Sequence, residues 1–271
     1  MELPDLSPMP PAYQERLRQA AAHFEADPRV VAMWVTGAVA RHGQDAGSDL
    51  DLCLTIEDRH AETFAREHES WIRAVVEPVS IQQMGSTSGW YVLTSSCERI
   101  DFLVESEATL ASSPGVRRIA VFDKKGCAGR LPAVQDPGPE PQTIAFYVTE
   151  ALRQMANFPV VIVRRDWLLG VVAVQQLHYF VYELFAQSNR PQPPTGPKQW
   201  SSKLSSRHRA LLEALPVPQP DRHSVVHAHS AAVDLFEAEA PPIARQAGVE
   251  WPRTLHEAVC RYRQRCYPPD W

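Results

Sequence analysis

The stretch from residue 35 to residue 52 reads Val-Thr-Gly-Ala-Val-Ala-Arg-His-Gly-Gln-Asp-Ala-Gly-Ser-Asp-Leu-Asp-Leu. The apolar run that begins at Val30 leads into it and predicts a buried strand that ends in a turn at Gly37. From Asp49 onward polar and apolar residues alternate, which predicts a second strand. Because side chains alternate along a strand, Asp49 and Asp51 share one face, roughly 6–7 Å apart.

Two carboxylates this close are the kind of oxygen ligand that Mg²⁺ prefers, together with substrate phosphates. A pair of such ions can polarise a phosphate under attack and stabilise the leaving oxygen. The backbone amides of Gly37 and Ala38, at a turn that opens a helix, can hold phosphate oxygens. An Asp-x-Asp pair alone is common on solvent-facing strands. The pair joined to a preceding strand and glycine turn predicts a metal and triphosphate site.

With these residues at this spacing, the segment resembles the signature of the DNA polymerase β-like nucleotidyltransferase superfamily. More narrowly, it is similar to the antibiotic nucleotidyltransferases, which include the aminoglycoside adenylyltransferases. The matching positions are Gly37, Ala40, Arg41, Ser48, Asp49 and Asp51. The resemblance implies two Mg²⁺ ions on the two aspartates and an ATP whose phosphates contact Gly37, Ala38, Arg41 and Ser48. The family commonly has serine at the position of Ala38 and often glycine at that of His42.

The family usually adds a third carboxylate from a neighbouring strand. Asp101 lies within the apolar strand expected at Arg99 to Val104. The resemblance implies that Asp101 is a metal ligand, a general base on the acceptor hydroxyl, or both. The alternative is a charged residue on the exposed face of an edge strand. Glu105, at the strand end, is the weaker candidate for the third acid.

The elements expected from periodicity change in character along the chain. Strands are expected at residues 30–35, 49–56, 79–83, 90–94, 99–104 and 118–122, with helices at 12–26 and 59–76. Only helices are expected afterwards, at 142–157, 164–187, 205–214, 224–246 and 253–265. A Pro-rich stretch at 132–142 separates the halves. We therefore predict an α+β fold, with a mixed-sheet nucleotidyltransferase domain at 1–135. A helical domain at 142–271 is implied to close the cleft for acceptor and nucleotide.

The helical half supplies further candidates. In similar proteins a lysine from this domain reaches the triphosphate, which points to Lys198 first and Lys203 second. Glu183 interrupts an apolar helical run and, with Glu150, is a candidate for binding a cationic acceptor, although an ion pair or exposed helix edge is the alternative. Asp166 either caps the following helix or lines the acceptor site.

A cluster of histidines invites a metal interpretation. His223 and His227 lie four residues apart on one predicted helix, and His229 follows. We expect a surface helix here and no zinc site.

The composition limits the partners. The 271 residues carry a formal net charge of -5, which gives no support for binding duplex nucleic acid. The five cysteines are scattered and odd in number, so we expect free thiols and a cytoplasmic setting. The longest uninterrupted apolar stretch, Trp167 to Val174, is too short to span a bilayer, and no membrane partner is expected. The oligomeric state stays open.

Two functions remain at this stage. The first is Mg²⁺-dependent transfer of AMP from ATP to a hydroxyl of a small acceptor, with an aminoglycoside-like antibiotic as leading acceptor. Lincosamides and a protein hydroxyl are lesser options. The second is a nucleotide-binding module without turnover, such as an antitoxin or regulator, which the alanine at position 38 and the histidine at position 42 motivate.

Overall fold

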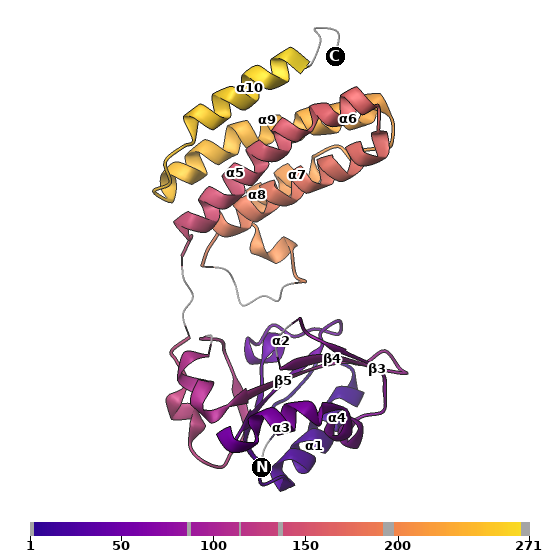
Figure 1. Cartoon of the computed structure of the whole chain (residues 1–271), viewed down its shortest axis with the longest axis vertical. Coiled ribbons are helices and arrows are strands. Elements are labelled where there is room, and N and C mark those ends of the chain that lie inside the picture. The colour runs from indigo at the N-terminus through magenta and orange to yellow at the C-terminus, as the bar shows by residue number, and fades with distance from the viewer. Residues whose placement is uncertain (1–2, 86–87, 114, 135–137, 192–197, 267–271) are drawn as a thin grey trace. The chain divides into compact units, whose positions relative to one another are not determined.

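The computed structural model describes residues 3–85, 88–113, 115–134, 138–191 and 198–266. Its contacts divide the described residues into two compact units, one ending at residue 134 and one beginning at residue 138 (Figure 1). The first unit contains a mixed sheet with helices, and the described part of the second is helical, so the predicted α+β class is confirmed. Residues 135–137, part of the expected linker, lie outside the described residues.

The first unit is built on a mixed sheet. Its strands are β1 (Val30–Val35), β2 (Leu50–Ile56), β3 (Pro78–Gln83), β4 (Gly89–Thr94), β5 (Arg99–Ser106) and β6 (Ile119–Asp123). They follow the order β3-β4-β5-β2-β1-β6. Only β2 and β5 pair in parallel, and the other described pairs are antiparallel. Every predicted strand is present, and no strand end differs from the prediction by more than two residues.

Helices cover one face of this sheet. Figure 1 shows α1 (Pro11–Ala26), α3 (Ala61–Arg66) and α4 (His68–Val75) on the same side. The apolar residues of β2, at alternate positions from Leu50 to Ile56, join the helices in one core. An aromatic cluster fills its centre and consists of Phe24, Phe64, Trp71, Trp90 and Phe102. The opposite face of β2 carries its polar side chains, including Asp51.

The prediction of a single helix at residues 59–76 is wrong. The chain forms a 3₁₀ turn, η1 (Asp58–His60), followed by α3 and α4, which separate at Glu67. The Glu67 carboxylate accepts a hydrogen bond from Arg29 at 2.6 Å. The next ring, that of His68, stacks on Trp90 with centroids 4.6 Å apart. No proline or glycine marks this break, so tertiary contacts rather than local sequence set it.

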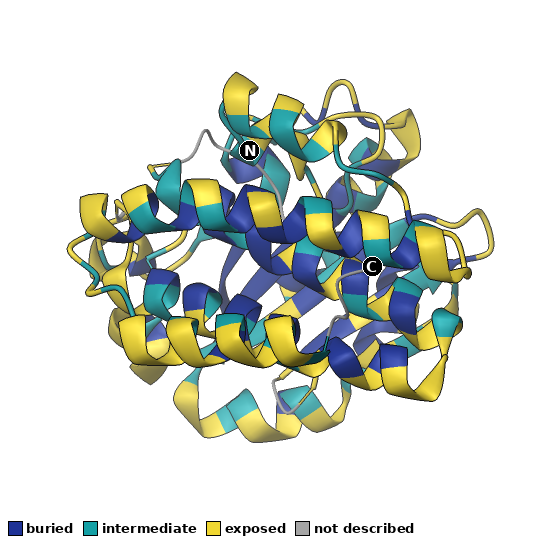
Figure 2. Ribbon diagram, turned by 90° about the horizontal axis from the view of Figure 1, so that it is seen from above, coloured by how far each residue is buried: buried dark blue, intermediate teal, exposed yellow. Residues whose placement is uncertain are grey.

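The second unit is a helical bundle. Its helices are α5 (Pro141–Asn157), α6 (Pro159–Arg164), α7 (Trp167–Ser188), α8 (Ser206–Glu213), α9 (Arg222–Gln246) and α10 (Arg253–Cys266). The three longest, α5, α7 and α9, pack against one another around a shared apolar core. Figure 2 shows that the helices bury stripes of residues and expose the rest.

The start of α7 differs from the expected helix at 164–187. Residues 159–164 form the separate helix α6, which ends where Arg165 adopts a left-handed backbone with φ of 53°. The Asp166 carboxylate then accepts a hydrogen bond from the Leu169 amide at 3.0 Å. The capping interpretation of Asp166 is therefore confirmed. Helix α7 is long and apolar enough to cross a membrane, but its buried side chains form the bundle core with α5 and α9, as in many water-exposed bundles.

The histidines of α9 correct another expectation. His223 and His227 are exposed, as predicted for a surface helix. His229 is buried instead, and its ring stacks on Phe158 with centroids 3.5 Å apart. The reason is that residue 229 falls on the stripe of α9 that faces the bundle, beside Val225 and Ala232.

Candidate functional site

The strand register brings two of the predicted acids together. Asp51 on β2 is the direct partner of Asp101 on β5. Neighbouring strands lie about 4.8 Å apart, and in-register residues project to the same face, so the two carboxylates leave the sheet side by side. Both residues are half-buried, which leaves them accessible. Asp49 lies two residues ahead of Asp51, directly before β2.

Gly37 makes room for the Asp51 carboxylate. The amide of Thr36 donates to the Asp51 carbonyl at 2.9 Å, which holds the turn after β1 against β2. Gly37 has φ of +61°, and a Cβ built there would lie 1.6 Å from Asp51 Oδ2. Glycine is therefore required twice, for its backbone angle and for the space that the carboxylate occupies. The turn and the acid form one structural unit.

The turn opens a short helix, α2 (Gly37–Ala40), whose first-turn amides have no carbonyl partner within the helix. Amides in this position are donors for an anion placed beside the acids. Arg41 ends the helix, and its Nε is buried with no hydrogen-bond partner among the described residues. The amides of the Gly37 turn thus supply positive character next to Asp51.

Ser48 has a local partner. Its hydroxyl accepts a hydrogen bond from the Asp45 amide at 2.9 Å and lies 3.2 Å from Asp45 Oδ1. The Asp45 carboxylate also accepts from the Gly47 amide at 2.8 Å. These bonds close the tight turn that delivers the chain into β2. The contact of Ser48 with a phosphate stays a prediction.

The two departures from the family pattern lie in the same loop. Ala38 is the second residue of α2 and brings a methyl group where the family commonly has a hydroxyl. His42 has φ of 57°, in the left-handed region that glycine adopts without strain. The turn therefore has a positive φ at position 42, which glycine adopts at lower cost than histidine.

Glu105, the weaker candidate for the third acid, is committed elsewhere. It lies four residues beyond Asp101 on the same face of β5, about 13 Å along the strand. Its carboxylate forms a two-pronged ion pair with the buried Arg118 and accepts from Thr55 at 3.1 Å and from Ser113 at 2.8 Å. The network holds β2, β5 and the start of β6 together, which is a structural role.

Tyr91 is a neighbour of the site that the sequence did not reveal. It is the antiparallel partner of Asp101 on β4, so it projects to the same face. Its side chain is 51% exposed, which places an accessible aromatic ring beside the acid. Only the strand pairing could have identified it, because alternation within β4 says nothing of which strand lies next to it.

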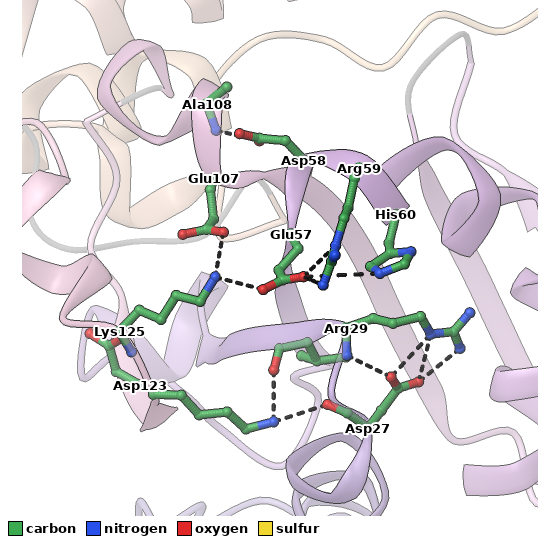
Figure 3. A network of polar contacts seen from close by, with 12 residues as sticks. Asp27, Arg29, Glu57, Asp58, Arg59, His60, Glu107, Ala108, Asp123 and Lys125 are labelled. Carbon is green, nitrogen blue, oxygen red and sulfur yellow. Dashed lines mark hydrogen bonds and ion pairs between the residues drawn. The ribbon is translucent and has the colours of Figure 1, made fainter.

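A salt-bridge network closes the opposite end of β2. Figure 3 shows Lys125 between the carboxylates of Glu57 and Glu107, at 2.8 and 2.9 Å. Arg29 pairs with Asp27 in the same view. Since Glu57 directly follows the last residue of β2, these charges lie at the end of the strand remote from Asp51. They tie the sheet to its loops and are separate from the paired acids.

The helical unit holds an acidic and aromatic face. Glu183 on α7 lies near Tyr147 of α5 and near Tyr179, and burial and then its charge raise the pKa of both phenols. Burial, and then the Glu183 carboxylate, raises the pKa of Tyr147 to about 12. On the same helix, Tyr182 stacks on Trp200 with centroids 4.3 Å apart.

A cavity of about 460 Å³ adjoins this face. Its lining includes Tyr179, Tyr182 and Trp200. Arg209 and Glu213 of α8, which pair at 2.7 Å, also contribute to the walls. The cavity lies wholly within the helical unit, and its walls combine aromatic, apolar and charged side chains.

The remaining predicted residues lie on the bundle surface. Glu150 pairs with Arg153 on α5 at 2.5 Å. Lys198 is exposed and Lys203, in the 3₁₀ turn η4 (Ser201–Lys203), is half-buried. The predicted roles of the two lysines in triphosphate binding stay predictions. Asp166, as described, caps α7.

Comparison with known proteins gave matches at the level of structure alone. No protein-family model matches the chain, and no curated protein matches it. An aminoglycoside 6-adenyltransferase from Bacillus subtilis is similar with 12% identity and a TM-score of 0.43, over 94% of this chain and 97% of that chain. The CdnE cyclic dinucleotide synthase of Elizabethkingia meningoseptica has 13% identity and a TM-score of 0.30, over 93% and 90%.

A CCA-adding enzyme has 9% identity and a TM-score of 0.38, over 94% of this chain and 70% of that one. At identities and TM-scores of this size, the likeness carries no argument about activity, substrate or acceptor. Function has to be argued from the chain's own residues.

Proposed function

We propose that this protein is a Mg²⁺-dependent nucleotidyltransferase that moves AMP from ATP to a hydroxyl of a small cationic acceptor. The observation that carries the proposal is the in-register pair of Asp51 and Asp101 beside the Gly37 turn. Position 37 has no room for a side chain because the Asp51 carboxylate occupies that space. This arrangement is hard to explain by stability alone. Two adjacent carboxylates repel each other unless a cation joins them.

The donor set suits the ions that the resemblance implies. Carboxylate oxygens from neighbouring strands are hard ligands, and Mg²⁺ binds to such groups together with phosphate oxygens. Asp49, Asp51 and Asp101 would hold the ions. When bound, these would offset the negative charge of the phosphates and of the leaving pyrophosphate.

The chain's own groups would do the rest. The first-turn amides at Gly37 and Ala38 donate to phosphate oxygens, and the Arg41 guanidinium adds positive charge beside them. Asp101 accepts the proton of the acceptor hydroxyl as that oxygen attacks phosphorus. Lys198 from the helical unit neutralises the pyrophosphate, and Ser48 keeps the turn before β2 in place and contacts the phosphates.

The aromatic and acidic face of α7 supports a cationic acceptor. A carboxylate beside several aromatic rings favours ammonium groups through charge attraction and cation–π contact. Glu183 has this environment, whereas Glu150 is already paired with its own Arg153. We therefore rank Glu183 first among the acceptor-binding candidates, followed by Glu150 and Asp166, with an aminoglycoside-like amine as the leading class. Five free thiols fit a reducing compartment, and we place the reaction in the cytoplasm.

A second candidate function has a specific observation behind it. Ala38 offers no hydroxyl to the phosphates, and His42 holds a strained left-handed backbone in the same loop. A site of this kind could keep ATP and Mg²⁺ without efficient transfer, as in a regulator or antitoxin. Lincosamides or a protein hydroxyl are further acceptors to compare with aminoglycosides.

The deciding experiment is an acceptor screen. The full chain is incubated with Mg²⁺, labelled ATP and a panel of aminoglycosides, lincosamides and hydroxyl-bearing proteins. Pyrophosphate release that requires an acceptor, with labelled AMP on the product, supports the enzyme. Asp49→Ala should abolish both signals. Glu62→Gln, a change at an exposed acid on α3, serves as the matched control and should keep full activity.

Binding is measured in parallel by calorimetry with a non-hydrolysable ATP analogue. Tight, Mg²⁺-dependent binding without transfer to any acceptor would favour the regulatory module. Absence of binding in the wild-type chain would contradict both candidate functions, because both need the acids to hold a metal and a triphosphate.

A further inference from the structure

Outside the paired acids, one group of metal-ligating side chains comes together in the helical unit. Glu237 of α9 and His256 and Cys260 of α10 have ligand atoms within 4.8 Å of one another. His256 Nε2 lies 2.7 Å from the Glu237 carboxylate and 3.5 Å from Cys260 Sγ. We propose that these three residues bind a divalent transition-metal ion of the zinc type, at a site distinct from the acids of the sheet.

The spacing favours this interpretation. His256 and Cys260 are four residues apart on α10, so both side chains project from one face of the helix. Glu237 approaches that face from the neighbouring helix. In a tetrahedral zinc site with bond lengths of about 2.0–2.3 Å, ligand atoms are roughly 3.3–3.8 Å apart. The observed separations need only small side-chain movements to reach that geometry.

The nature of the donors points to zinc rather than magnesium. A thiolate and an imidazole are borderline-soft ligands, which Mg²⁺ avoids and which Zn²⁺ or Co²⁺ prefers. A single ring nitrogen faces both the carboxylate and the thiol. When this nitrogen carries a proton, it can donate a hydrogen bond to the carboxylate or to the sulfur. A cation between His256, Glu237 and Cys260 would interact with all three groups.

The Cys260 thiol lies beside a negative charge, the Glu237 carboxylate. Burial, followed by the Glu237 carboxylate, raises the pKa of the Cys260 thiol, while Arg263 and Arg261 oppose the shift. A divalent ion would release the thiol proton on binding and would compensate the charges of both the thiolate and the carboxylate. All three residues are half-buried, so an ion can enter and a water can complete its coordination.

A structural benefit follows from where the site lies. Helix α10 buries a single apolar side chain, Val259, so hydrophobic packing attaches it weakly. A metal shared by α9 and α10 would add a strong link where the core supplies little. The ion would then determine whether this helix stays docked on the bundle.

The test uses Co²⁺, because a cobalt–thiolate bond has a charge-transfer absorption that carboxylate sites lack. The full chain is reduced with a phosphine and titrated with Co²⁺ in a non-chelating buffer. We expect a charge-transfer band and tetrahedral visible bands that saturate at one ion per chain and disappear on adding Zn²⁺. Because the acids of the sheet have no thiolate, Asp51→Asn should leave these bands intact, which separates this site from the proposed function.

Variants on α10 decide the ligands. Cys260→Ser should lose the charge-transfer band, and His256→Asn should weaken Co²⁺ binding at least about tenfold. Cys266→Ser, on the same helix but outside the cluster, is the matched control and should bind as the wild type does. Zn²⁺ should raise the melting temperature of the wild type and of Cys266→Ser, but not of Cys260→Ser.

Two results would overturn the proposal. One is the absence of a thiolate band in the reduced wild type at excess Co²⁺. The other is a band that persists in Cys260→Ser, which would assign it to a different thiol. Far-ultraviolet circular dichroism of each metal-free variant guards against misfolding, and Glu237→Gln, which keeps the side chain's size, provides a second variant if Cys260→Ser does not fold.

Discussion

Asp51 on β2 and Asp101 on β5 are direct partners across the only parallel strand pair among the described residues. This relationship separates Asp101 from Glu105, which lies on the same face of the same strand. Asp101→Asn should lower kcat/KM for transfer roughly 10²-fold or more, because the base and a metal ligand are lost together. The free energy of unfolding of the Asp101→Asn variant should differ from that of the wild type by no more than about 1 kcal/mol, because Asp101 is only half-buried.

Glu105→Gln should lower the free energy of unfolding and leave kcat/KM for transfer nearly unchanged. Removing its charge leaves the Arg118 guanidinium, with a side chain 5% exposed, without its counter-charge. Breaking a buried pair in this way costs about 3 kcal/mol or more. Urea unfolding and steady-state kinetics on both variants make the comparison. A stable but inactive Glu105→Gln would contradict the assignment of roles.

Gly37→Ala should damage the site beyond its backbone cost. The new Cβ would meet Asp51 Oδ2 at 1.6 Å, so the carboxylate has to move. Gly126→Ala is the matched control in the same unit, with φ of +70° and open space around the Cβ. A positive φ alone costs about 1–2 kcal/mol in either variant. We expect Gly37→Ala to lose more stability than Gly126→Ala, and only Gly37→Ala to lose Mg²⁺-dependent ATP binding. Equal losses in the two variants would refute the steric coupling between position 37 and Asp51.

Ala38→Ser tests whether the missing hydroxyl limits the reaction. A hydroxyl at the second residue of α2 adds a donor next to the Gly37 turn. A hydrogen bond to a charged phosphate contributes about 1.5 kcal/mol, which corresponds to roughly a tenfold gain in kcat/KM for ATP. Initial rates at varied ATP and fixed acceptor measure it. Unchanged kinetics would mean that the backbone amides already suffice.

Glu183→Gln should affect the acceptor and leave ATP alone. The change removes a negative charge flanked by Tyr147 and Tyr179 while keeping the side chain's size. We expect KM for a cationic acceptor to rise roughly tenfold, with KM for ATP unaltered. Glu150→Gln, at an acid already paired with Arg153, should change the acceptor KM little. An effect of Glu183→Gln on the KM for ATP would argue against this division of roles.

Stability should fall as the pH drops from about 7.5 to about 5.5. Burial lowers the pKa of His178 and His208 and lowers that of His229 well below 6.5, with Arg263 and His178 adding to the effect at His229. Below pH 6.5 the unfolded chain therefore binds protons that the folded chain does not, and the free energy of unfolding decreases. For one histidine the slope is at most about 1.4 kcal/mol per pH unit.

Urea unfolding at several pH values measures this slope. His229→Gln should reduce it, because that variant no longer takes up a proton at position 229 on unfolding. The carboxylates with lowered pKa, such as Glu98 and Glu239, titrate at more acidic pH and leave this window undisturbed. A stability that is flat from neutral to mildly acidic pH would contradict the buried, neutral state of His229.

Much of the fold follows from local pattern. In α1, Leu17 and Phe24 lie seven residues apart, two helical turns, and both are buried. The strand at Val30–Val35 and the alternation of β2 also agree with expectation, because β-branched runs and a period of two are local signals. The paired acids followed from the same alternation joined to a family resemblance.

What the sequence could not supply was pairing between distant segments. Nothing near Glu67 signals that a helix should break there; Arg29 and Trp90 impose the break from elsewhere in the fold. Likewise, Tyr91 became visible as a neighbour of Asp101 only through the register of β4 with β5. The spacing of the cysteines does not indicate the cluster of Glu237 with α10, because its local signal is a His and a Cys one helical turn apart and Glu237 comes from another helix.

The contact between Gly37 and Asp51 has a consequence for how such chains evolve. A side chain at position 37 and an acid at position 51 exclude each other, so the two positions change as a pair. A lineage that loses the acid removes the collision, and only the backbone cost of the positive φ then opposes a larger residue at 37. From then on, a single mutation that restores the acid meets a collision, and the loss becomes a one-way step. Across homologous genomes, the residue at position 37 is therefore expected to act as a historical marker: glycine in lineages that still use the acid, and other residues in those that abandoned it.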